Sequence, residues 1–329
     1  MTYVHQILDT AATSVNQGAV ATIIQVQGSS YQKEGSMMLL WDNGEKLGML
    51  SVGCIEEELS YYAKECSEAW SIHTFDTKSE DDISWGVGCN GTIHVLVERI
   101  TPELQKSLQI VHHHLSYGEK IWMIKNLSLH QTLFITEKGE LCGNWEGDIP
   151  NIATLKSGRE NNIYIQCILP QPRLFLFGAG EDAKSVVRLA NEMNFLITVC
   201  DWREELCSPS HFSEANAFIV GFPKETFPQI TLTAYDFVVI MTHNFKRDQE
   251  LLELFSANPP YYLGILGPRH RTSRIFEGKC IPHWISSPIG LPIGARGDKE
   301  IALSIMGEII QKLRGISDES SGGFPSRRK

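Results

Sequence analysis

"RLFLFGAGEDA", residues 173–183, decides the fold of the C-terminal half of this chain. The apolar run before Gly178 is typical of a strand that helices cover on both faces. Gly178, Gly180 and Ala183 follow in the G-x-G-x-x-A spacing, which permits a tight turn, a backbone approach to a pyrophosphate and close packing of the next helix. Asp201 closes the next apolar run about 20 residues later, where a carboxylate can bind a ribose diol. The pattern predicts a dinucleotide-binding turn, although the same turn also occurs in folds that bind nothing there.

The sequence around this turn alternates between strand and helix patterns. Near-continuous apolar runs occupy residues 173–178, 195–201, 217–221, 235–243 and 261–267, with helical patterns between them. This alternation is typical of parallel strands with helices on both faces. We therefore expect an α/β fold with a Rossmann-like, doubly wound parallel sheet at residues 169–315. Glu181 and Asp182 suit the start of its first helix but would repel an incoming phosphate.

The N-terminal half mixes strands and helices without strict alternation. Its candidate helices cover residues 3–17, a segment that begins near Ile55, and 101–115. Its candidate strands cover residues 19–28, 36–41, 92–98, 120–127, 131–143 and 162–169, with a turn and a short strand at 42–48. We therefore expect an α+β domain at residues 1–168. The polar, glycine-rich end, residues 316–329, is expected to be a mobile tail.

The composition narrows the class of protein. A chain of 329 residues with 42% hydrophobic and 21% charged residues is typical of a soluble globular protein with two cores. No stretch approaches the ~18 apolar residues of a membrane helix, and residues 1–20 lack a secretion signal, so we expect a cytoplasmic protein without membrane contact. The net charge of -10 argues against nucleic acid as a partner. The eight cysteines include no CxxC pair and fit reduced thiols.

Further candidate ligand groups follow the later strands of the C-terminal half. His243 comes after the fourth apolar run and could be a base, a ligand or a hydrogen-bonding anchor, or merely a turn residue. Arg269 belongs to an arginine-rich segment, 266–274, that could bind an anion or simply begin a solvated helix. Gly294 and Arg296 lie in a glycine-dense stretch, which favours backbone close to a ligand or to another protomer.

Two cysteines of the N-terminal half stand beside glycines. Cys54 follows Gly53 at a predicted helix start, where the helix dipole would stabilise a thiolate. Glu56 and the two carboxylates after it oppose a second negative charge, so Cys54 suits a metal or sulfur ligand better than a free nucleophile. Cys89, with little bulk around it, could face a ligand. The alternative for both thiols is that they are buried and inert.

Several of these segments together resemble the XdhC/CoxI family, the accessory proteins of xanthine dehydrogenase and related molybdenum hydroxylases. The similar segments are residues 21–59, 88–98, 178–183, 240–248, 266–274 and 292–310, and the resemblance covers nearly the whole chain. The family motifs fall on three groups of residues: Gly28, Ser29 and Ser30; Gly53, Cys54 and Glu56; and Cys89 with Gly91. Val52 and Asn90 stand where the family usually has glycine, and Tyr31 with Gln32 replaces a common Pro-Arg pair.

The resemblance implies a protein that binds the molybdenum cofactor (molybdopterin) and shields it during maturation to its sulfurated form. Such a protein delivers the cofactor to apo-xanthine dehydrogenase or a related hydroxylase, with a cysteine desulfurase as a further candidate partner, and need not turn over a substrate. Cys54 and Cys89 would be the metal ligands, because sulfur suits a soft metal centre. The backbone amides after Gly178 would hold the pterin phosphate or a nucleotide extension. The candidate cofactor-binding residues are Gly28, Ser29, Ser30, Gly53, Cys54, Glu56, Cys89, Gly91, Gly178, Gly180, Asp201, His243, Arg269, Gly294 and Arg296.

Two alternatives to an accessory protein remain open. An NAD(P)-dependent oxidoreductase would use the same Rossmann-like turn, with His243 as acid or base. A structural component or scaffold of the dehydrogenase itself is a third interpretation, although the chain lacks the clustered cysteines of iron–sulfur domains. A homodimer is kept as an open expectation.

Overall fold

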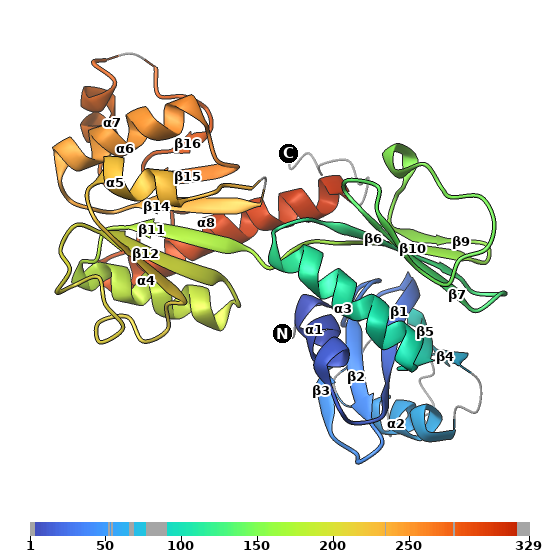
Figure 1. Cartoon of the computed structure of the whole chain (residues 1–329). Helices are drawn as coiled ribbons and strands as arrows, with labels where there is room; N and C mark the ends of the chain where they lie inside the picture. The colour runs from blue at the N-terminus through green and yellow to red at the C-terminus, as the bar shows by residue number, and fades with distance from the viewer. Residues whose placement is uncertain are drawn as a thin grey trace. The chain divides into compact units, whose positions relative to one another are not determined.

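The structure of the chain is a computed structural model, shown in Figure 1. It describes residues 4–51, 53, 55–65, 69–76, 91–233, 235–278 and 280–320. The chain divides into two units. The N-terminal unit comprises Met1–Pro170 and Asp318–Lys329, and the C-terminal unit comprises Gln171–Ser317.

The C-terminal unit contains a six-stranded sheet whose strands all run parallel. Its order is β13-β12-β11-β14-β15-β16, so the chain moves outward from the central strand β11 and then returns to β14 on the other side. The strands are β11 (Arg173–Phe177), β12 (Leu196–Asp201), β13 (Ala217–Val220), β14 (Asp236–Ile240), β15 (Tyr262–Ile265) and β16 (Ile285–Ser286). The predicted Rossmann-like, doubly wound sheet is confirmed, and its switch point lies between β11 and β14.

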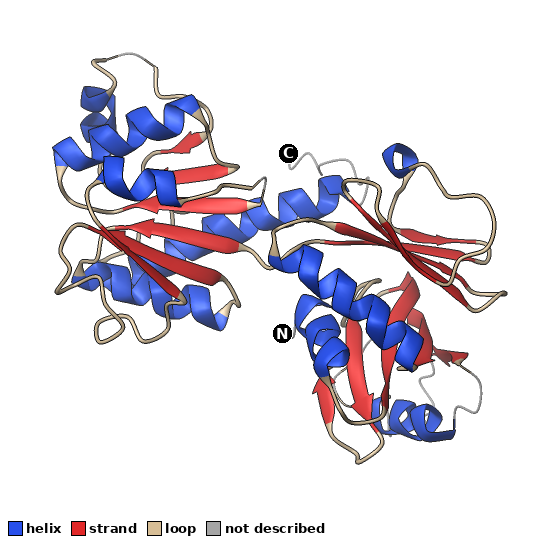
Figure 2. Cartoon of the chain, in the orientation of Figure 1, coloured by secondary structure: helices blue, strands red, loops and turns tan. Residues whose placement is uncertain are grey.

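Helices connect these strands on both sides of the sheet (Figure 2). They are α4 (Glu181–Glu192), α5 (Pro223–Thr226), α6 (Phe245–Ala257), α7 (Arg269–Ile275) and α8 (Gly297–Ser320), with a short 3₁₀ turn at Phe227–Gln229. Leu251, Leu252 and Phe255 of α6 pack against the apolar side chains of β11, β14 and β15. The last helix, α8, buries Ala302, Ile305, Met306 and Ile309 completely. The Ser185 hydroxyl of α4 donates to Asp298 of α8 at 2.6 Å, which joins the starts of the two helices.

The N-terminal unit contains two antiparallel five-stranded sheets. The first has the order β3-β2-β1-β5-β4 and consists of β1 (Gly18–Gly28), β2 (Met37–Trp41), β3 (Lys46–Gly48), β4 (Trp70–Asp76) and β5 (Gly91–Arg99). The second has the order β8-β7-β6-β10-β9 and consists of β6 (Ile121–Asn126), β7 (Gln131–Thr136), β8 (Leu141–Gly143), β9 (Gly158–Glu160) and β10 (Ile163–Ile168). The helices are α1 (Val4–Thr13), α2 (Glu56–Glu65) and α3 (Pro102–Ser116), with a 3₁₀ turn at Ile152–Thr154. The unit is therefore an α+β structure, as the sequence predicts.

Both sheets share one apolar core with α1 and α3. A charged pair also links them inside this core. The Lys125 ammonium of β6 lies 2.6 Å from the Glu98 carboxylate of β5, and the two side chains are only 2% and 9% exposed. The ammonium also donates to the Thr132 hydroxyl at 3.1 Å and lies 5.0 Å from the centre of the Trp70 ring. The ammonium thus has partners from both sheets and a neighbouring ring, and the Glu98 carboxylate accepts hydrogen bonds from Lys125 and Thr132, as buried ions require.

Some element boundaries differ from the sequence prediction. The first helix ends at Thr13 rather than near residue 17, because Gly18 already begins β1. The strand β4 was not predicted, because its sequence, WSIHTFD, alternates between apolar and polar residues only in part. Helix α8 continues to Ser320, past residue 316 where the tail was expected to begin, and residues 321–329 lie outside the described part. Within the described residues, no helix has the length and apolar content that a bilayer crossing needs.

The buried pair between the sheets generates a stability prediction. Glu98→Ala leaves the Lys125 ammonium without its carboxylate, and we expect the free energy of unfolding in urea to fall by about 3–5 kcal/mol. The double variant Glu98→Leu/Lys125→Met replaces the pair with apolar groups and should recover most of that loss. A Glu98→Ala protein within about 1 kcal/mol of the parent would mean that the pair does not hold the sheets together.

Candidate functional site

The turn after β11 passes very close to the loop after β14. Gly178 has a φ of +119°, and a Cβ at this position would lie 2.4 Å from the Met241 carbonyl oxygen. Only glycine tolerates both conditions. Gly180 is the N-cap of α4. Ala183, in the first turn of the same helix, is completely buried. Gly178 and Ala183 thus have the turn and packing roles that their spacing predicts, while the approach of a pyrophosphate at Gly180 stays a prediction.

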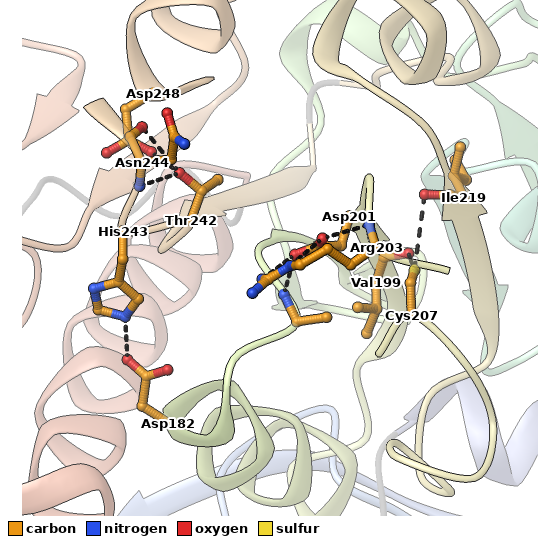
Figure 3. Close-up of polar contacts among 11 residues, drawn as sticks. Asp182, Val199, Asp201, Arg203, Cys207, Ile219, Thr242, His243, Asn244 and Asp248 are labelled. Atoms are coloured by element: carbon orange, nitrogen blue, oxygen red, sulfur yellow. Dashed lines mark hydrogen bonds and ion pairs between the residues drawn. The ribbon is translucent and has the colours of Figure 1, made fainter. Parts of the chain in front are cut away.

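Asp201 lies at the end of β12 and holds this turn in place (Figure 3). Its carboxylate accepts hydrogen bonds from the Ala179 N–H at 2.7 Å, from the Arg203 N–H and Nε at 2.9 Å each, and from Arg203 Nη2 at 2.7 Å. Burial alone would raise the pKa of Asp201, but the hydrogen bonds from Arg203 and Ala179 outweigh it and lower the pKa below its usual value. These donors fill the acceptor positions of a carboxylate. A contact between Asp201 and a ribose stays a prediction, and it would require Arg203 to move away.

His243 connects the loop after β14 to the start of α4. Its backbone is left-handed, with a φ of +57°, and its Nε2 lies 2.7 Å from the Asp182 carboxylate (Figure 3). The imidazole side chain is 61% exposed, so a ligand at this edge can reach it. Asp182, which by sequence would repel a phosphate, therefore has a partner that carries a positive charge when protonated. This geometry is that of a hydrogen-bonding anchor.

Behind His243 lies a buried group of polar side chains. The Asp248 carboxylate, 1% exposed, accepts a hydrogen bond from the Thr242 hydroxyl and forms an ion pair with Arg271. Burial raises the pKa of Asp248, against the opposing effect of these hydrogen bonds. The Arg271 Nη2 atom is buried and has no hydrogen-bond partner among the described residues. Arg271, which belongs to the predicted anion-binding segment 266–274, is thus already paired with a buried carboxylate.

A small hollow lies beside Asp201. The hollow beside Asp201 has a volume of about 10 Å³, which is room for about one water molecule. Arg247 helps to close it, since its guanidinium lies 4.3 Å from the Phe222 ring and 5.9 Å from the Trp202 ring. The residues that line the hollow are Phe177, Cys200, Asp201, Trp202, Gly221, Pro223, Thr226, Thr242, Arg247 and Leu251. The hollow itself is therefore too small for a nucleotide ring.

The first family motif of the N-terminal unit lies at the paired ends of β1 and β5. Gly28, with a φ of +85°, pairs with Gly91 in the antiparallel register. A Cβ at Gly91 would lie 2.3 Å from the Ser29 carbonyl oxygen, so only glycine lets the two strands meet here. The structure therefore brings Gly28, Ser29 and Gly91 together, with Ser30 next in the chain.

The second motif is organised by Glu56 at the start of α2. Its carboxylate, in a residue only 7% exposed, accepts hydrogen bonds from the Leu50 N–H at 3.1 Å, the Ser51 N–H at 2.7 Å and the Ser51 hydroxyl at 2.6 Å. Burial opposes ionisation, but these hydrogen bonds from Ser51 and Leu50 lower the pKa of Glu56 overall. Gly53 is exposed, with a φ of +106°, and no described atom lies within 4 Å of the position of a Cβ. Glu56 thus fixes the loop on which Gly53 stands.

Three of the remaining candidate residues lie at the starts of α7 and α8. Arg269 is exposed at the start of α7, beside a separate hollow. Gly294 is exposed with a φ of +73°, and the Arg296 N–H donates to the Glu300 carboxylate at 2.7 Å at the beginning of α8. Cys54 and Cys89 fall outside the described residues. Among those residues the structure does describe, no three His, Cys, Asp or Glu side chains are placed to share a metal ion.

Sequence reasoning missed the partners of the predicted residues. The D-x-R spacing of Asp201 and Arg203 could have indicated their ion pair, because an arginine two residues after an aspartate can fold back onto it. No local pattern signals the contact between His243 and Asp182, which are 61 residues apart in the chain.

Comparisons with known proteins agree with this geometry. Residues 174–309 match the family model described as XdhC Rossmann domain, residues 11–76 match the XdhC and CoxI family, and residues 102–169 match the BH1974-like central domain. The chain is 36% identical to a probable xanthine dehydrogenase subunit of Bacillus subtilis (strain 168), over 95% of this chain and 98% of that protein. It is 27% identical to the uncharacterized protein YqeB of Escherichia coli (strain K12), over 51% of this chain and 31% of that protein.

A solved structure extends the match to three dimensions. The crystal structure of a xanthine dehydrogenase from Bacillus halodurans is 36% identical in sequence and superimposes with a TM-score of 0.88, over 95% of this chain and 96% of that one. The similarity therefore includes both units and runs through nearly the whole length of each protein. On these grounds the chain belongs to the XdhC/CoxI family, which is related to xanthine dehydrogenase.

Proposed function

We propose that this protein is an accessory factor that binds the molybdenum cofactor and assists its maturation and insertion into xanthine dehydrogenase or a related molybdenum hydroxylase. The observation that carries the proposal is the match of the XdhC and CoxI motifs and of the XdhC Rossmann domain within one chain. A relative that is similar over nearly its full length is named as a probable component of xanthine dehydrogenase.

The chemistry of the candidate residues fits this cofactor. When bound, the cofactor supplies a redox-active metal on a dithiolene and a phosphate on its pterin. Thiols such as Cys54 and Cys89 suit the soft metal centre. The amides in the first turn of α4 suit the phosphate. A Cβ at Gly180 would meet only the Asp182 carboxylate among the described atoms, so the backbone at this turn is open to a ligand.

In this proposal the chain binds and orients rather than catalyses. Glu56 holds the loop of Gly53 in one conformation through its hydrogen bonds to Ser51 and Leu50. At the other turn, protonated His243 would offset the charge of Asp182 and would make the start of α4 more attractive to an anion.

The oxidoreductase alternative has less support from the geometry. A nicotinamide dinucleotide would need the Asp201 carboxylate for its ribose, and Arg203 occupies it. The hollow beside this carboxylate, at about 10 Å³, is also too small for a nucleotide ring.

A permanent component of the dehydrogenase is the second candidate, favoured by the name of the Bacillus subtilis relative. The two proposals differ in the lifetime of the complex. An accessory factor should carry molybdenum and pterin when purified alone, restore activity to apo-hydroxylase, and then separate from it on size exclusion. A protein that holds no pterin and stays bound in equal amounts to the active dehydrogenase would instead be a permanent component.

The thiols give the most direct test of cofactor binding. We expect Cys54→Ala and Cys89→Ala to reduce the molybdenum and pterin content of the purified protein by about tenfold or more, since each change removes a soft ligand. The melting temperature should stay within a few degrees of the parent. Cys280→Ala is the control, because Cys280 is an exposed, free cysteine of the C-terminal unit. Full cofactor content in both the Cys54 and Cys89 variants would remove these thiols from the site.

Glu56 generates a prediction about pH. Because its folded-state pKa lies below the ordinary value of 4.5, its stabilisation is complete above that pH and is lost as the pH falls through the lowered pKa. We expect Glu56→Gln to reduce the free energy of unfolding by about 2 kcal/mol at pH 7, and the difference from the parent to shrink below about pH 4.5. Urea unfolding at a series of pH values measures both.

The matched control for this experiment is Glu57→Gln. The Glu57 side chain is 86% exposed and pairs with Lys46 at the surface, so its loss should change stability little at any pH. Identical pH profiles for the Glu56 and Glu57 variants would contradict the role assigned to Glu56.

A further inference from the structure

The chain approaches α8 through an exposed segment, residues 292–297. The residue before it is anchored, because the Leu291 N–H donates to the Ser304 carbonyl oxygen of α8 at 3.1 Å. Most of the residues that follow are exposed. Gly294 and Gly297 both have a φ of +73°, and no described atom lies within 4 Å of the position of a Cβ at either residue. The segment therefore makes two left-handed turns without close packing around its glycines.

A hydrogen bond ties the end of this segment to α4. The Ser185 hydroxyl, in the second turn of α4, donates to the Asp298 carboxylate at 2.6 Å, and this bond lowers the pKa of Asp298. Among the described residues, 292–300 form no other polar contact with a different helix or strand. The bond therefore holds the start of α8, together with the segment before it, against α4.

The carboxylates in the first turn of α4 already have cationic partners. Glu181 pairs with Lys184 at 2.8 Å, and Asp182 lies 2.7 Å from the imidazole of His243. Lys184 offsets the charge of Glu181, and His243 offsets that of Asp182 when it is protonated. The start of α4 therefore repels an anion less than its sequence alone indicates.

Arg296 is a cation without such a partner. Its side chain is exposed and forms no ion pair with any carboxylate that the structure describes, although its backbone N–H donates to Glu300 at 2.7 Å. Arg296 stands two residues before Asp298, so the bond between Asp298 and Ser185 also brings it toward α4. A guanidinium there adds a forked donor to the backbone amides of the first turn.

We propose that Ser185 and Asp298 are positioning residues for the ligand of the α4 turn. Their hydrogen bond holds residues 292–297 beside the start of α4, so that the Arg296 guanidinium binds the anionic group of the ligand together with the amides of the first turn. The inference rests on the proposed function, which places a phosphate at those amides. It adds two residues that do not touch the ligand but act through a third.

Cofactor retention by the full chain tests the inference. We expect Ser185→Ala to lower the molybdenum and pterin content after dialysis by about tenfold, because Arg296 is no longer held in place. Arg296→Gln should have the same effect. The double variant should lose no more than Arg296→Gln alone, since a positioning residue acts only through the group it positions. The melting temperature should change by only a few degrees.

Conservative variants and a neighbouring lysine serve as controls. Ser185→Thr keeps a hydroxyl, and Asp298→Asn keeps an acceptor oxygen, so both should retain the parent's cofactor content, whereas Asp298→Ala should match Ser185→Ala. Lys299→Gln should also leave the content unchanged, because adjacent side chains on a helix point about 100° apart.

Hydrogen–deuterium exchange separates this inference from the proposed function, because it needs no cofactor. Exchange at residues 292–297 should rise in Ser185→Ala and Asp298→Ala, and stay at the parent level in Ser185→Thr. Unchanged exchange in Ser185→Ala, or additive losses of cofactor in the double variant, would overturn the inference. A parent protein that carries no pterin would instead overturn the proposed function, and the exchange data would still decide whether the bond holds the segment.

Discussion

The contact between Gly178 and the Met241 carbonyl oxygen is the constraint on which the C-terminal unit depends. The two loops at the switch point can approach this closely only because one of them has no side chain. That approach sets where α4 begins and places His243 within reach of Asp182. Asp201 then secures the turn from the other side through Ala179 and Arg203. Backbone geometry, rather than any single charged residue, therefore gives this edge of the sheet its shape.

The N-terminal unit also depends on a close approach of two backbone segments and on a buried carboxylate. Gly91 lets β5 meet β1 at Ser29, while Glu56 fixes the loop before α2 with three hydrogen bonds. Gly178 and Gly91 are explained by the lack of space for a side chain and Gly28 and Gly53 by a left-handed backbone, while Asp201 and Glu56 accept hydrogen bonds from nearby N–H groups. The membership of the chain in the XdhC/CoxI family rests on the comparisons rather than on this geometry.

The sequence was sufficient for the fold and for part of the site. Apolar runs and G-x-G-x-x-A spacing are local signals, and they located the parallel sheet and the turn at Gly178 correctly. The strands β4, β9 and β16 escaped prediction because their apolar patterns are short or irregular, and pairing with a neighbour rather than propensity makes them strands. The ion pair of Asp201 and the bond between Ser185 and Asp298 could not be found from apolar patterns. The latter joins residues 113 positions apart, which only tertiary packing brings together. The roles of Cys54 and Cys89 stay predictions.

Helix α8 has a consequence for how the protein is made. The side chains of Ala302, Ile305, Met306 and Ile309 are completely buried, yet they come from α8, which follows all six strands of the parallel sheet in the sequence. During synthesis, β11 to β16 therefore emerge from the ribosome before their final covering exists. All described strands of the N-terminal sheets have been synthesised by Ile168, well before α8. The order of translation thus lets the two N-terminal sheets form before the parallel sheet receives α8, which is synthesised after all of its strands.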